Sequence, residues 1–137
     1  MVRILDRSSP NLFEGENKMT IAALLSKIDD EKPNSFEDER LIAFITEIEA
    51  EVAEQLRVFA PVYSADDKNK NLLAPAPYDR LYVSYVKSMI DLANEEMGSY
   101  QNNAAQHVQD FRDFTDWVVR SGIASQTEAY TRFSGIF

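Results

Sequence analysis

The chain has 137 residues, of which 45% are hydrophobic and 27% charged, so it can bury the core of one domain of ordinary size. Its 14 lysines and arginines against 23 aspartates and glutamates give a net charge of −9, which argues against nucleic-acid binding because phosphate recognition needs clustered cations. The absence of cysteine excludes disulfide bonds, thiolate nucleophiles and cysteine-ligated metal sites.

The N-terminal residues 1–18 have no sustained helical period and contain Pro10 and Gly15, so we expect an extension or arm. They lack the apolar core of a signal peptide, and no apolar run in the chain reaches the ~18 residues that span a bilayer. We therefore expect an intracellular protein without membrane contact.

Two amphipathic segments follow this arm. Apolar residues in the segment 19–30 have the spacing of one helical face, with Thr20 as the N-cap and Pro33 as the stop. The segment 36–57 predicts a long helix capped by Ser35. Its apolar face holds Leu41, Ile45, Ile48, Val52 and Leu56. Its other face is predicted to hold Glu47, Glu49, Glu51 and Glu54.

The segment 58–76 breaks the helical pattern with two prolines and a polar run at 66–71. It predicts a long loop, and loops of this length in a small domain are often functional. A helix is then predicted from Tyr78 to an end near Gly98, with Pro77 tolerated next to its first turn. Its apolar stripe consists of Tyr82, Tyr85, Val86, Met89, Ile90, Ala93 and Met97.

A further helix is predicted over residues 100–120 and ends at Gly122. Its inward positions are predicted to be Ala104, Val108, Phe111, Thr115 and Val118, flanked by Phe114 and Trp117. The fold class is therefore all-α: a small bundle of three main helices, one or two short helices, a long loop at 58–76 and terminal arms. Residues 19–122 form the helical domain, and residues 123–137 form a C-terminal tail.

The residues offer little for catalysis. His107 is the single histidine, so the usual histidine-containing zinc and di-iron centres cannot form, and we interpret it as a partly exposed, inert histidine. No glycine-rich phosphate loop or nucleophile elbow is present. Carboxylate pairs such as Glu95 with Glu96 are more simply solvated faces. We expect no catalytic, cofactor-binding or metal-binding residues and no enzymatic activity.

The acidic residues are concentrated, with ten of them between Asp29 and Glu54 against two basic residues. Three interpretations stay open: a solubilising helix face, a surface for a basic partner, and a mimic of DNA phosphates. The aromatic residues are either core filling or interface anchors. Those in the tail favour an interface, and the candidate interface residues are Tyr130, Phe133, Ile136 and Phe137.

A longer pattern covers residues 74–120, which combine a proline-rich opening, a tyrosine-rich helix and an aromatic helix that ends near a tryptophan. The pattern consists of Pro75, Pro77, Tyr78, Asp79, Tyr82, Tyr85, Ile90, Asp91, Ala93, Asn94, Glu96, Tyr100, Asn102, Ala104, Phe111, Phe114 and Trp117. A Lys-Pro-Asn pause at 32–34 precedes the acidic helix. Over residues 19–120 the chain resembles the head–tail connector (adaptor) proteins of long-tailed bacteriophages, particularly those related to prophage connectors of Gram-positive hosts. Residues 1–18 depart from the family pattern.

The resemblance implies a structural protein of the virion, present in the host cytoplasm during assembly. Connectors of this kind form a ring of about 12 copies beneath the portal protein and carry the stopper or tail-completion protein. Genomic DNA passes through the ring without specific binding. An acidic wall suits such a channel, which makes Glu47, Glu49, Glu51 and Glu54 candidate channel-facing residues.

Two other classes stay open. A small acidic regulator or DNA mimic would bind a basic partner with steep salt dependence. An enzyme would require a metal or cofactor that the sequence does not indicate.

Overall fold

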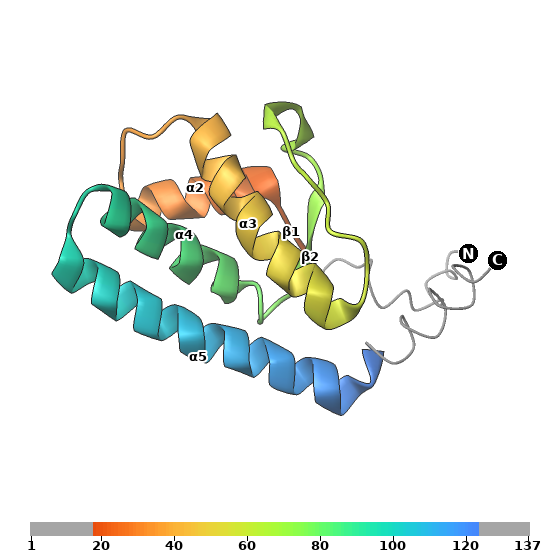
Figure 1. The fold of residues 1–137 in the computed structure, drawn as a ribbon. Helices are drawn as coiled ribbons and strands as arrows, with labels where there is room; N and C mark the ends of the chain where they lie inside the picture. The colour runs from red at the N-terminus through yellow and green to blue at the C-terminus, as the bar shows by residue number, and fades with distance from the viewer. Residues whose placement is uncertain (1–17, 124–137) are drawn as a thin grey trace.

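The computed structural model describes residues 18–123, which are mostly helical (Figure 1). The elements in chain order are β1 (Lys18–Thr20), α2 (Ile21–Glu31), α3 (Asp38–Leu56), the short 3-10 helix η1 (Ala65–Asp67), β2 (Asn71–Pro75), α4 (Arg80–Ala93) and α5 (Met97–Ser121). The predicted all-α class is confirmed, with a small two-stranded sheet added to it.

The two C-terminal helices form an antiparallel hairpin, and α5 lies along the whole length of α4 (Figure 1). Helices α2 and α3 also pack against α4, which makes α4 the central element of the fold. The largest fully buried side chains are Tyr82, Phe114, Ile21, Leu24, Ile28, Ile42, Ile45, Ile48, Leu56, Leu72, Leu81 and Ile90. Helices α2 and α3 supply seven of these twelve side chains.

The start of α2 follows the prediction, because Thr20 is its N-cap and the Thr20 hydroxyl oxygen accepts a hydrogen bond of 3.1 Å from the amide of Ala23. The start of α3 differs from the prediction. Asn34, and not Ser35, organises the approach: its side chain donates to the carbonyl of Lys32 and accepts from the amide of Phe36, each at 2.9 Å. An asparagine that bridges its own neighbours in this way favours a turn, so α3 begins later, at Asp38.

The segment 58–76 is more ordered than a long loop. It contains η1, capped by Ser64, and then β2, which pairs antiparallel with β1. The register places Lys18 opposite Pro75 and Thr20 opposite Asn71. The sequence does not reveal this pairing because the strands are only three and five residues long and belong to distant parts of the chain.

The hairpin between α4 and α5 also differs from its predicted boundaries. Helix α4 ends at Ala93, Glu95 makes the turn with a left-handed φ of 60°, and Gly98 already lies inside α5. Two predicted inward positions, Ala93 and Met97, are consequently exposed. The end of α5 agrees with the prediction, since Gly122 is its C-cap with a φ of 70°.

The predicted register of α5 is only partly right. Phe114, expected to flank the core, is fully buried, and Val108, expected inside, is 54% exposed. The error has a physical cause: α5 buries polar as well as apolar residues against α4, so apolar spacing alone misplaces its inner face.

Candidate functional site

The four glutamates proposed to face a channel do not share one environment. Glu49 is fully buried, so its prediction as a channel-facing residue is wrong. Glu47, Glu51 and Glu54 are exposed on α3. We call these three residues the α3 acidic stripe.

The carboxylate of Glu49 joins three parts of the fold. Its Oε1 accepts a hydrogen bond from the Tyr82 hydroxyl of α4 at 2.5 Å. Its Oε2 accepts from the Tyr63 hydroxyl at 2.8 Å and from the amide of Leu73 in β2 at 2.9 Å. The Tyr82 hydroxyl in turn accepts from the amide of Ala74 at 2.9 Å. Glu49 therefore holds β2 and the preceding segment against α3 and α4, which is a structural role.

Burial raises the pKa of Glu49, and the hydrogen bonds from Tyr82, Tyr63 and Leu73 only partly offset that effect. The sequence did contain a signal for this burial. Glu49 lies four residues after Ile45 and three before Val52, which puts it beside the apolar face of α3.

The α3 acidic stripe has few partners of its own. The Tyr85 hydroxyl donates to Glu47 at 3.0 Å. Among residues 18–123, Glu51 and Glu54 form no ion pair. The stripe is therefore an exposed negative surface whose charge the rest of the described chain does not neutralise.

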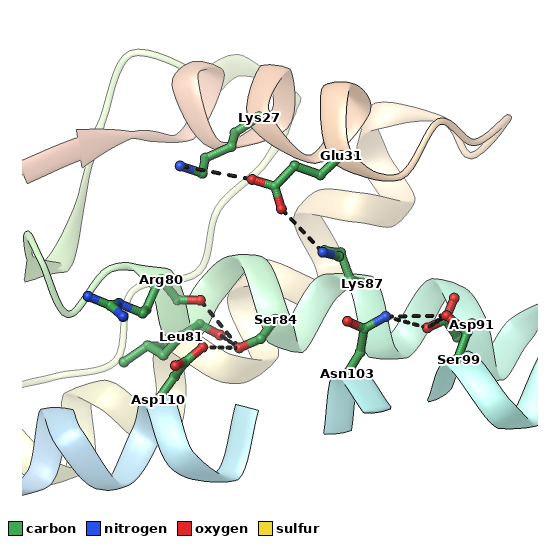
Figure 2. A network of polar contacts seen from close by, with 10 residues as sticks. All are labelled: Lys27, Glu31, Arg80, Leu81, Ser84, Lys87, Asp91, Ser99, Asn103 and Asp110. Carbon is green, nitrogen blue, oxygen red and sulfur yellow. Dashed lines mark hydrogen bonds and ion pairs between the residues drawn. The ribbon is translucent and has the colours of Figure 1, made fainter. Parts of the chain in front are cut away.

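On another side of α4, an open cleft of about 250 Å³ lies between α2, α4 and α5 (Figure 2). We call it the α2–α4 cleft. It is lined by Lys27, Glu31, Arg80, Val83, Ser84, Lys87, Asn103, Gln106 and Asp110. Glu31 pairs with two of these cations: its carboxylate lies 4.0 Å from Lys27 Nζ and 3.2 Å from Lys87 Nζ. The third cation, Arg80, forms no ion pair among the described residues. Its guanidinium makes one hydrogen bond, from Nε to the carbonyl of Pro77 at 3.2 Å.

The floor of this cleft contains a buried carboxylate, Asp110, which is 2% exposed. It accepts hydrogen bonds of 2.9 Å from the Ser84 hydroxyl and from the Gln106 amide. These contacts satisfy both of its oxygens and join α4 to α5, so Asp110 serves packing.

A second buried acid, Asp91, lies farther along the same hairpin (Figure 2). Its Oδ2 accepts hydrogen bonds from Ser99 at 2.8 Å and Asn103 at 2.6 Å, and its Oδ1 lies 2.5 Å from Lys32 Nζ. Burial raises the pKa of Asp91, but the contacts with Lys32, Asn103 and Ser99 outweigh burial and hold the pKa below its usual value. Lys32 also pairs with Glu96 at 2.8 Å, so one ammonium ties the α2–α3 connection to the α4–α5 turn.

His107 is half-buried on the inner side of α5. It packs between Tyr85 and Phe111, with ring centroids 5.2 and 5.8 Å away, and its Nδ1 lies 3.0 Å from the carbonyl of Leu81. Burial lowers the pKa of His107, which favours the neutral ring at pH 7. Its contacts are those of a packing residue, so His107 is less superficial than the sequence predicted.

Several apolar side chains have no cover within the described residues. Phe59 is 91% exposed and Val62 80% exposed in the connection after α3, and Val119 is 79% exposed on α5. The candidate interface residues of the tail lie outside the described residues. They are Tyr130, Phe133, Ile136 and Phe137.

Within residues 18–123, no group of three or more histidines, aspartates or glutamates is arranged to hold a metal ion. The helices of this same region include none that is both long and apolar enough to cross a membrane. Comparison with known proteins adds no relative: no family model, no curated protein and no solved structure matches the chain.

Proposed function

We propose that the protein is a head–tail connector of a long-tailed bacteriophage, a structural subunit that assembles into a ring beneath the portal protein and carries the stopper or tail-completion protein. The observation that carries this proposal is the ordered pattern of residues 74–120, which covers the α4–α5 hairpin and the last two residues of β2.

Several residues of that pattern hold the helices of the fold together. Tyr82 bonds to Glu49, Asp91 joins α4 to α5, and Phe114 is fully buried. Trp117 stacks on Tyr78 with ring centroids 5.3 Å apart. These packing contacts support similarity of fold and assembly.

The exposed side chains also suit a subunit that assembles. Phe59 and Val62 are large apolar residues on the surface, and fully buried apolar anchors are the usual centre of protein interfaces. The α3 acidic stripe is available to face passing DNA or a neighbouring copy. If it faces DNA, its negative charge would keep DNA from adhering to the ring.

A second candidate function is a small acidic regulator or DNA mimic, and the unpaired charge of the α3 acidic stripe is the observation that favours it. Such a protein would bind a basic partner, and its affinity would fall steeply with salt. A connector docks through apolar contacts as well, so its attachment would weaken less with salt.

The portal protein of the phage that encodes this chain would be the partner that tests the proposal. We expect the full chain to cosediment with assembled portal rings, and a chain that ends at Ile123 to fold but to lose this attachment. The truncation begins after Ile123 because that residue is buried in the core. Circular dichroism checks that the shortened chain is folded. If the full chain does not cosediment with the portal but binds a basic protein in low salt, the regulator is the better assignment.

A further inference from the structure

The α2–α4 cleft has an excess of positive charge, and the α3 acidic stripe is negative. Within residues 18–123 of one copy, some of these charged groups have no ion-pair partner. The cleft holds three cations, Lys27, Arg80 and Lys87, against two acids, Glu31 and Asp110. Among the described residues, Arg80 forms no ion pair, although its charge and that of Lys27 act on nearby Asp79. The Arg80 guanidinium uses one of its five N–H donors. A free guanidinium fork suits a carboxylate, which it can bind through two parallel hydrogen bonds.

The α3 acidic stripe is an unfavourable arrangement for an isolated helix. Glu47 and Glu51 are four residues apart, and Glu51 and Glu54 three apart, so like charges face each other along the same side. An approaching basic surface would relieve this repulsion.

The two surfaces lie on opposite sides of α4. Tyr82 and Tyr85 extend from α4 toward α3, where they bond to Glu49 and Glu47. Arg80, Ser84 and Lys87 line the cleft instead (Figure 2). With about 100° of rotation per residue, the first pair and the second group project from opposite faces of the helix. One copy therefore cannot bring its own stripe to its own cleft.

We propose that the α2–α4 cleft receives the α3 acidic stripe of a second copy, with Arg80 as the central contact to Glu51. This inference rests on the proposed function, which requires the copies to assemble into a ring. The proposed contact joins two different patches, the cleft of one copy and the stripe of the next. Contacts of that kind are head-to-tail, and they close into a ring when the rotation permits. The stripe is thereby assigned to the contact between copies and not to the channel wall.

Cross-linking tests this contact directly, because the natural chain has no cysteine that would interfere. The variants Gln106→Cys in the cleft and Ala50→Cys beside the stripe leave every charge in place, and both positions are exposed. We expect a short bismaleimide to join the two variants when they are mixed on portal rings. A chain that carries both substitutions should give a ladder of multimers. The matched control replaces Gln106→Cys with Asn102→Cys, an exposed position of α5 outside the cleft, and should give little product.

Charge reversal then tests the central pair. Arg80→Glu should lower the cross-linking yield by about tenfold, and adding Glu51→Arg should restore it. If the wild-type chain attaches to the portal but the cleft and stripe variants do not cross-link above the control, this contact is wrong and the connector function stands. If the wild-type chain does not attach, the connector function and the contact both fail.

Discussion

At the scale of single residues, the structure separates glutamates that the sequence groups together. Glu49 forms its contacts inside the molecule, and Glu54, one turn and a half farther along α3, faces outward. The difference matters because a buried carboxylate satisfied by three donors cannot be removed without leaving those donors unpaired.

Glu49→Ala should therefore lower the free energy of unfolding by about 3–5 kcal/mol, since it leaves the hydroxyls of Tyr82 and Tyr63 and the amide of Leu73 without their acceptor. Glu54→Ala is the matched control on the same helix and should change it by less than about 0.5 kcal/mol. Urea denaturation followed by circular dichroism measures both variants. Equal, small effects would contradict the structural role of Glu49.

The raised pKa of Glu49 determines whether its contribution to folding stability increases or decreases with pH. A carboxyl group whose pKa is higher in the folded state binds its proton more tightly there, so its contribution to stability is complete below its unfolded pKa and is lost as pH rises through the folded pKa. Asp91 has the opposite shift, and its contribution is lost as pH falls through its lowered pKa.

As the pH rises from the ordinary pKa of a glutamate toward the raised pKa of Glu49, this residue should therefore make the wild-type chain less stable. Glu49→Gln removes this titration, so its stability should fall less over the same range. Thermal unfolding of both chains at several pH values measures the difference. Parallel curves for the two chains would show that Glu49 titrates normally in the folded protein.

At the scale of elements, α5 shows how a long helix can have an inner face that is only partly apolar. Phe114 and Val118 are buried there together with Asp110, and the exposed side includes Val108 and Val119. The polar residues are accommodated because α4 offers matching groups such as Ser84.

Phe114→Ala should lower the free energy of unfolding by about 3–5 kcal/mol because it opens a cavity between α4 and α5. Val108→Ser, on the exposed side of the same helix, should change it by less than about 0.5 kcal/mol. Chemical denaturation distinguishes this register from the one that the sequence predicts. A larger effect at Val108 than at Phe114 would contradict the structure.

The elements that the sequence predicts well are those controlled by local chemistry. Thr20 caps α2, the apolar spacing defines α3, and Gly122 ends α5. The missed features depend on contacts between distant segments. The pairing of β1 with β2 and the burial of Glu49 beside Tyr82 need the folded arrangement, and the turn at Glu95 replaces the glycine that a local rule expects.

The α3 acidic stripe and the α2–α4 cleft also differ in how far local sequence predicts them. The acidic residues of α3 were predicted to face outward together, although the spacing of Glu49 from Ile45 and Val52 indicates that this one lies beside the apolar face. Sequence reasoning missed the α2–α4 cleft altogether, because Lys27, Arg80 and Gln106 come from three different helices. No short spacing in the sequence connects these residues.

At the scale of the whole molecule, the described chain is a small helical domain with uncovered apolar side chains at Phe59 and Val62 and unpaired charge on two sides of α4. An isolated subunit gains nothing from either feature. Both are understandable in a subunit that is completed by neighbours, which is the arrangement that the connector proposal describes.

The most direct measurement of this proposal is electron microscopy of the full chain mixed with its portal protein. The proposal predicts a second ring of about 12 copies, stacked coaxially on the portal and prolonging its central channel. Portal rings that remain bare at saturating concentrations of the chain, or that bind it at scattered positions away from the axis, would contradict the connector function.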